Sequence, residues 1–192
     1  GIDTETGVGR IDAVAAVERA VATILTVESD ADAGPGTLRA AITDLNAAAA
    51  VGGMEGGAII FPAPLTITLK TELPAITAPG IVLSGVGTVI EGEQLSAEGA
   101  PETNASGLVI GADGVVLDNV ALFNFADAGV WIRGADDVVV TQTFVIGNGV
   151  GVRVDQGATG VSLGTLVRTG VIATGNLAEG ILIAGPETSA VR

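Results

Sequence analysis

The sequence predicts an all-β fold in which short parallel strands stack as a repeat, the arrangement of a parallel β-helix, with a helix before the first repeats. Three observations predict it. A small residue followed by an apolar–x–apolar triplet recurs over residues 57–192. Gly, Asn and Asp recur at the ends of these triplets, where the chain must turn. Hydrophobic residues make up 48% of the chain but aromatic residues only 3%, which suits a narrow aliphatic core.

The repeat has a period of about 22 residues. The triplets begin at Ala58, Gly80, Gly107, Gly129, Gly151 and Gly180, which gives intervals of 22, 27, 22, 22 and 29 residues. One coil of three short strands cannot bury its inner face, whereas coils stacked about 4.8 Å apart bury a continuous apolar column. We expect the longer intervals to be surface excursions at 93–106 and 165–174. The pattern of a leucine-rich repeat does not recur.

Residues 25–56 are expected to form a strand and a helix before the repeat. A strand is predicted at 25–27, followed by a polar stretch and a Gly-Pro-Gly turn. Thr37 is a suitable N-cap for a helix over Leu38–Ala50, with Leu38, Ile42 and Leu45 on one face. The Gly52-Gly53 pair ends the helix.

The segment DADAGPGTLRAAITDLN, residues 30–46, carries a resemblance. It is similar to the start of many secreted bacterial right-handed parallel β-helix proteins, in which D-x-G-P-G-[ST]-L-R-x-A-I-x-x-x-N precedes the first coil. The resemblance implies a right-handed solenoid, a helical cap over its N-terminal end and an extracellular or cell-surface location. The general preference for right-handed crossovers agrees with that hand.

Residues 1–24 predict a separate amphipathic helix over 9–24. Its apolar positions are Ile11, Val14, Val17, Val21 and Ile24. The string GVGRIDAVAAVERA, residues 7–20, resembles the last helix of subtilisin-like serine protease domains. The resemblance implies an upstream protease domain, so that this chain is a fragment of a larger secreted protein. The catalytic Asp, His and Ser of that family have no matching positions here, and no protease activity is carried over.

Composition excludes several function classes. The chain has no His and no Cys, which removes Ser-His-Asp and Cys-His catalysis and the usual zinc sites. Asp and Glu outnumber Lys and Arg by 22 to 8, giving a net charge of -14 that opposes binding to nucleic acid or anionic membranes. No apolar run reaches the roughly 18 residues that span a bilayer. We therefore expect no enzyme, no cofactor and no membrane insertion.

Stacked carboxylates are the first candidate for chemistry. Asp113 and Asp136 lie in Gly-Ala-Asp turns one repeat apart, with Asp137 and Asp155 nearby, while Thr159 occupies the third position. The plain interpretation is that these are solvated turn residues. The alternatives are a calcium site and a carboxylate pair for glycoside hydrolysis. An enzyme for acidic sugars would also need cations, and the nearby ones are Arg133 and Arg153.

Trp131 and the outward apolar positions form the second candidate. Trp131 is the middle residue of a triplet and therefore points outward, with Val109 and Arg153 as its equivalents on the adjacent coils. Ile60 and Val82 are further outward apolar positions. A monomer normally makes such positions polar, so a covered surface is expected. The predicted interaction surface consists of Trp131, Val109, Val116, Val139 and Leu182.

Three asparagines lie near predicted turns, at Asn124, Asn148 and Asn176. They could form an internal amide ladder in which each side chain bonds the next coil, or they could be ordinary turn residues.

Three functions follow from these features. The first is a non-catalytic, self-assembling extracellular module, such as a subunit of a fibre, stalk or adhesin, that binds copies of itself or another protein domain. The second is a carbohydrate-active or glycan-binding domain of the pectin-lyase kind that uses the stacked carboxylates. The third is an accessory domain of a subtilisin-like protease.

Overall fold

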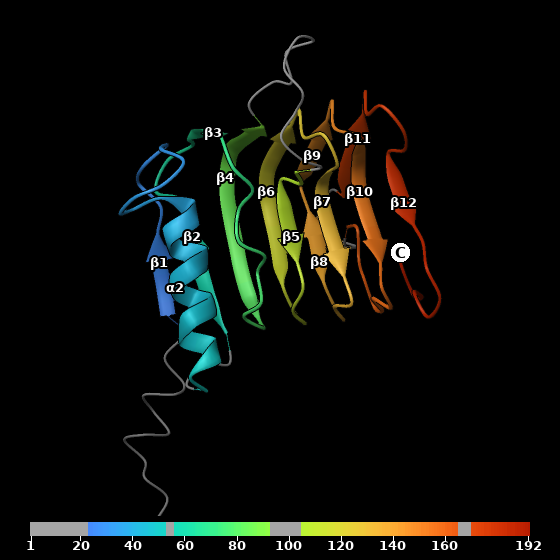
Figure 1. Ribbon diagram of the computed structural model, residues 1–192, viewed down its shortest axis with the longest axis horizontal. Coiled ribbons are helices and arrows are strands. Elements are labelled where there is room, and N and C mark those ends of the chain that lie inside the picture. Colours follow the sequence, from blue (N-terminus) through green and yellow to red (C-terminus); the bar gives the residue numbers. More distant parts are fainter. Residues whose placement is uncertain (1–22, 53–55, 93–104, 165–169) are drawn as a thin grey trace, which may run out of the picture.

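The protein consists of two parallel sheets and one helix in a computed structural model that describes residues 23–52, 56–92, 105–164 and 170–192 (Figure 1). The sheets have eight and four strands, and every strand pairing recorded in them is parallel. In the described part of the chain, no helix is long and apolar enough to cross a membrane.

The larger sheet follows the chain from its N-terminal to its C-terminal side. Its strand order is β1-β2-β4-β6-β9-β11, with β3 paired to β4 and β8 paired to β6. The strands are β1 (Thr23–Thr26), β2 (Gly57–Ile60), β3 (Thr66–Leu69), β4 (Ile81–Gly92), β6 (Val116–Phe123), β8 (Val139–Thr141), β9 (Thr143–Ile146) and β11 (Val171–Thr174).

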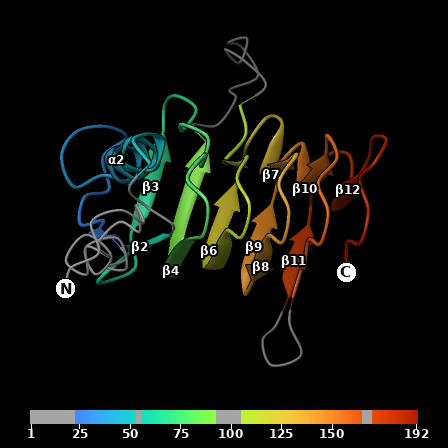
Figure 2. The same cartoon turned by 90° about the horizontal axis from the view of Figure 1, so that it is seen from below.

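The smaller sheet runs alongside the C-terminal part of the larger one. It has the order β12-β10-β7-β5. Its strands are β5 (Leu108–Ile110), β7 (Ala128–Arg133), β10 (Val150–Asp155) and β12 (Ile181–Ile183). The arrows in Figure 1 show that its strands point opposite to those of the larger sheet, and Figure 2 shows how the strands succeed one another along the molecule. The chain therefore passes back and forth between the two sheets.

The helix α2 (Leu38–Ala50) is confirmed with its predicted bounds. Thr37 is its N-cap, because its side chain accepts a hydrogen bond from the backbone N–H of Ala40. The predicted face is buried, with Leu38, Ile42 and Leu45 each about 1% exposed. The helix packs on β1 and β2, at the end of the molecule where the smaller sheet has no strand opposite them (Figure 1).

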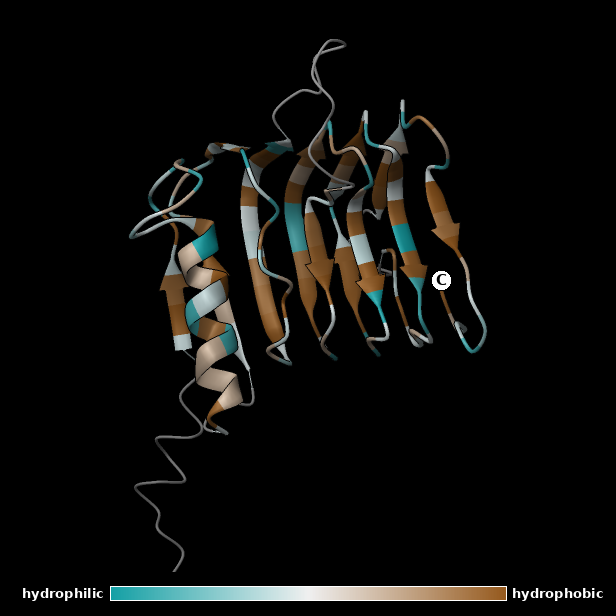
Figure 3. Ribbon diagram, viewed as in Figure 1, coloured by the Kyte–Doolittle hydropathy of each residue, from teal (hydrophilic) through white to brown (hydrophobic). Residues whose placement is uncertain are grey.

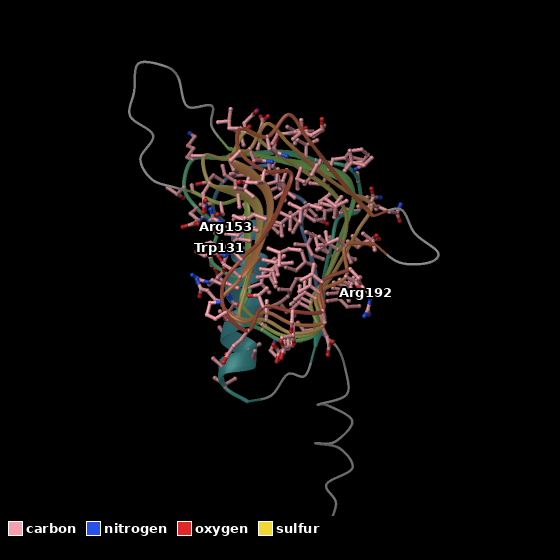
Figure 4. The ribbon with its side chains drawn as sticks, turned by 90° about the vertical axis from the view of Figure 1, so that its right-hand side faces the viewer. Trp131, Arg153 and Arg192 are labelled. Atoms are coloured by element: carbon pink, nitrogen blue, oxygen red, sulfur yellow. The ribbon has the colours of Figure 1, made fainter. Side chains whose placement is uncertain are left out.

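The core lies between the two sheets. Leu83, Leu117 and Val140 stack in register on the inner side of the larger sheet, and Val130 faces them from the smaller one. These side chains are at most 1% exposed. Figure 4 looks along the stack and shows aliphatic side chains filling the space between the sheets. The aliphatic composition thus corresponds to the core that the sequence predicted.

The predicted fold class, a right-handed parallel β-helix, is wrong. The described residues form two separate parallel sheets of unequal size and one helix, a mixed architecture without a closed solenoid. A 22-residue period predicts that neighbouring strands are parallel and roughly one repeat apart. It does not fix how many strands make a turn or whether the turns close, because apolar alternation looks the same in either sheet.

The register of the repeat is confirmed in its later part and wrong in its earlier part. The triplets after Gly107, Gly129, Gly151 and Gly180 pair in register in the smaller sheet. The triplets that begin at Ala58 and Gly80 lie instead in the larger sheet. There they are shifted by two residues, with Ala58 opposite Val82.

Three smaller expectations also change. Residues 1–22 lie outside the described residues, and so does most of the helix predicted at 9–24, but Thr23 and Ile24 belong to β1. The predicted strand at 25–27 therefore begins earlier. The excursion expected at 165–174 ends in a strand, because Val171–Thr174 is β11 and pairs with β9. Most of the excursion at 93–106 lies outside the described residues, although its last residue, Ser106, is buried.

Candidate interaction surfaces

The outer side of the larger sheet carries rows of apolar side chains that cross the strands. We call this surface the apolar face. It follows from alternation, because the residues between the buried positions of each strand point away from the core. Its members are Ile24, Ala58, Val82, Val116 and Val139 in one row, Ile60 beside them, Val89, Ala121, Phe144 and Ile172 in another row, and Phe123 and Ile146 in the last.

Large side chains on the apolar face are open to solvent. The relative exposure is 61% for Ile24, 42% for Phe144 and 47% for Ile172. Ile60 and Val82, which the sequence predicted to point outward, are each 39% exposed. Figure 3 shows the same strands mostly in brown, with a teal band in β6. An apolar surface of this extent is typical of a place where another molecule packs.

Charge is sparse on the apolar face. The charged residues in its rows are Asp118 and Glu91, and each carboxylate accepts a hydrogen bond from a threonine hydroxyl on a paired strand. Thr141 Oγ1 lies 2.7 Å from Asp118 Oδ1, and Thr68 Oγ1 lies 2.8 Å from Glu91 Oε1. The net charge of -14 is therefore carried mostly elsewhere on the chain.

The outer side of the smaller sheet carries a cluster around Trp131. The guanidinium carbons of Arg133 and Arg153 lie 5.1 and 5.3 Å from the centre of the Trp131 ring, within cation–π range. The indole Nε1 donates a hydrogen bond of 2.8 Å to Asp155 Oδ1 on the next strand. The ring is half-buried, and Figure 4 shows Trp131 beside Arg153.

Arg153 also forms an ion pair with Asp127. Its two terminal nitrogens lie 2.9 and 2.8 Å from the carboxylate oxygens of Asp127. The side chains of Arg153 and Asp127 are 23% and 13% exposed, so the pair is largely shielded from water. Ser106 Oγ donates a third bond to Asp127, at 3.1 Å. The Trp131 cluster is therefore held together by its own internal contacts.

The predicted interaction surface divides between the two sheets. Trp131, Val109 and Leu182 share one outer row of the smaller sheet, whereas Val116 and Val139 lie on the apolar face. These two groups cannot contact one partner surface together, because the core lies between the sheets. Val109 is only 5% exposed, so it adds little surface of its own.

The two arginines are not equivalent positions of the repeat. Arg153 lies opposite Trp131, and Arg133 lies opposite Asp155. The cluster therefore contains two cross-strand pairs of unlike side chains, which a repeat of like residues would not have.

The stacked carboxylates are hydrogen-bonded turn residues. Asp113 Oδ1 accepts the backbone N–H of Asp136 at 2.8 Å. Asp136 Oδ1 in turn accepts the backbone N–H and the hydroxyl of Thr159, at 3.0 and 2.6 Å. Each side chain thus caps a backbone group in the next repeat, and threonine continues the series because its hydroxyl can donate to the aspartate.

The remaining calcium candidates have other contacts. Asp137 has a φ of 55°, and its backbone N–H donates to the carbonyl oxygen of Thr159. Gly114, one repeat earlier, has a φ of 68° and donates to the carbonyl oxygen of Asp136 in the same way. Asp155 belongs to the Trp131 cluster. Within the described ranges, no group of three or more His, Cys, Asp or Glu residues is arranged to hold a metal ion.

Two of the three asparagines form the amide ladder. Asn148 is fully buried, donates from Nδ2 to the carbonyl of Leu122 at 3.1 Å and accepts the N–H of Phe125 at 3.0 Å. Asn176 Oδ1 accepts the backbone N–H of Asn148 at 2.9 Å. Asn124 is instead a turn residue in the left-handed region, with a φ of 62°.

The ladder is one reason why two of the triplets begin with glycine. A Cβ on Gly129 would lie 2.8 Å from Asn148 Nδ2, and a Cβ on Gly151 would lie 2.7 Å from Asn176 Nδ2. A Cβ at Gly151 would also collide with the backbone carbonyl oxygen of Gly180.

Sequence reasoning missed Asp127, Phe144 and Ile172. The ion pair between Asp127 and Arg153 spans 26 positions and leaves no local pattern. Phe144 and Ile172 lie outside the triplets, but alternation within 143–146 and 171–174 could have placed both on an outer side.

Comparison with known proteins adds no functional assignment. No protein-family model matches the chain, and no curated protein matches it at a significant level.

Proposed function

We propose that the chain is a non-catalytic structural module that acts by binding protein, including copies of itself, at the surface of a cell or outside it. The observation that carries this proposal is the apolar face, where large side chains such as Phe144 and Ile172 are more than 40% exposed. Burying apolar surface is the main driving force of protein association, at about 25 cal/mol per Å². Such a role suits a subunit of a fibre, stalk or adhesin, or an accessory domain beside a protease.

The polar groups of the molecule support the same proposal. The carboxylates of Asp113, Asp136 and Asp127 are engaged in turn caps and an ion pair, which stabilise the fold. A carboxylate pair for hydrolysis needs one acid and one base open to the substrate. Association through the apolar face needs no such group.

The experiment measures association of the purified chain over a wide range of concentration. Sedimentation and electron microscopy are expected to show dimers or larger assemblies. A monodisperse monomer at the highest concentration reached would contradict the proposal. A second variant, Ile183→Lys, tests whether the edge strand of the smaller sheet takes part in association. Ile183 is an apolar residue that is 50% exposed and lies away from the apolar face.

A second candidate function, glycan binding, is favoured by the Trp131 cluster. A half-buried indole next to the exposed Arg133 offers a ring face and a cation to an acidic sugar. Calorimetry with acidic polysaccharides, with and without calcium, tests it. Binding that is lost in Trp131→Ala and kept in Phe144→Thr would favour this function.

A further inference from the structure

The apolar face has a particular partner that fits its size, charge and shape. We infer that a second copy of the chain packs on it face to face, so that two larger sheets form the inner layers of a two-fold symmetric dimer. This inference rests on the proposed function and assigns its binding surface and its partner.

The size of the apolar face matches a stable dimer. The face has two halves along β4, one over β1-β2-β4-β6-β8 and one over β3-β4-β6-β9-β11. Five strands have four spacings, about 19 Å in all, and the 12 residues of β4 run about 36 Å through both halves. The face thus offers about 700 Å² per copy, and specific dimers bury about 600–1,000 Å² per partner.

Charge favours a copy that presents the same face. Two chains of net charge -14 repel each other over most of their surface. They approach at the least cost where acids are few, and the acids within the rows, Asp118 and Glu91, already accept hydrogen bonds from threonines. A two-fold axis makes both partners use this one patch, so neither brings a charged surface to it.

The shape of the face suits sheet-on-sheet packing. Two sheets pack about 10 Å apart when the side chains between them interdigitate. The outer rows supply aliphatic side chains around Phe144 and Phe123, which is the composition of such a layer. The inner side of each sheet is already filled by the core, so the second copy completes a four-layer stack.

The first test measures dimerisation by sedimentation equilibrium on the whole chain. Phe144→Glu places two carboxylates in the dimer interface, one from each copy. It is expected to raise the dimer dissociation constant at least 100-fold. The matched control is Leu177→Glu, because Leu177 is an apolar residue 86% exposed and lies outside the rows. The control is expected to dimerise like the wild type. Circular dichroism confirms that both variants remain folded.

The second test uses the absence of cysteine. Val82→Cys introduces one thiol within the apolar face, at a position that is 39% exposed, and Leu182→Cys introduces one on the outer side of the smaller sheet. A bis-maleimide with a spacer of about 10 Å, the separation of packed sheets, is expected to link Val82→Cys chains into dimers and to leave Leu182→Cys chains single.

The outcomes separate the inference from the proposed function. If Phe144→Glu chains associate as well as the wild type while Ile183→Lys chains lose association, the face-to-face dimer is overturned and a self-associating module remains. Cross-linking that is stronger at Leu182→Cys than at Val82→Cys has the same meaning. A wild-type chain that stays monomeric, together with Val82→Cys chains that are not cross-linked, overturns both.

Discussion

The outer sides of the two sheets differ in how many of their side chains already have partners within the chain. On the smaller sheet, Trp131 donates to Asp155 and stacks on two guanidinium groups, and Arg153 is paired with Asp127. On the larger sheet, side chains such as Ile24 and Phe144 remain exposed with no polar role to fulfil.

This difference teaches where to look for function in the molecule. The Trp131 cluster has the unusual residues, including the single Trp, but its groups contribute to folding through contacts with each other. The apolar face has ordinary residues in an unusual place. The apolar face makes fewer contacts within the chain, so its burial by a partner would contribute more binding free energy.

The largest expected effect lies between the two sheets, where Asn148 joins β9 to β10. Asn148→Ala leaves the Phe125 N–H and the Leu122 carbonyl buried without their partner. Each such loss costs about 1–3 kcal/mol, so we expect the free energy of unfolding to fall by about 3 kcal/mol. Urea denaturation followed by the fluorescence of Trp131 measures it. Asn176→Ala, near the end of the ladder, should cost less, and an equal loss would argue against the ladder as a stabilising unit.

The next effect concerns the smaller sheet. Arg153→Met keeps much of the packing on Trp131 but leaves the Asp127 carboxylate, 13% exposed, without its cation. We expect a loss of about 2 kcal/mol, discounted for partial exposure. The double variant with Asp127→Asn should recover part of it. Arg133→Ala, which removes only a ring contact, is expected to cost about 0.5 kcal/mol, and a larger cost would mean that Arg133 has a further partner.

The smallest expected effect is the different response of the two outer sides to ionic strength. Raising the ionic strength shortens the range over which the net charge of -14 repels a second copy, so the dimer should tighten several-fold between about 0.02 and 0.5 M salt. The stability that the Arg153–Asp127 pair contributes should fall slightly over the same range. A dimer that weakens with salt would show that ion pairs, not apolar contacts, hold the two copies together.

The sequence predicts well those features that depend on neighbours along the chain. The helix at Leu38–Ala50 is confirmed because its N-cap at Thr37 and its apolar spacing are local. The pairing of the Gly129 and Gly151 triplets is confirmed, whereas the same 22-residue spacing gave the wrong register for the Ala58 and Gly80 triplets. Closure of the fold and the sheet to which the Gly80 triplet belongs depend on tertiary packing, and no local pattern records either.

The candidate residues show the same limit. Trp131 and Val82 point outward as alternation requires. The pairing of Trp131 with Asp155 and of Arg153 with Asp127 depends on side-chain reach across strands and turns. Periodicity can place a residue on a face, but it cannot say which polar partner it finds there.

The parallel pairing also bears on how the chain acquires its structure. In both sheets, successive strands pair with a strand that precedes them by about one repeat, as β7 follows β5 and β10 follows β7. Each new strand therefore meets a formed edge soon after it is synthesised, and each closing loop is about one repeat long. With α2 packed on β1 and β2, the earliest edge is in place first. A chain of this kind can assemble in the order of its synthesis, one strand at a time.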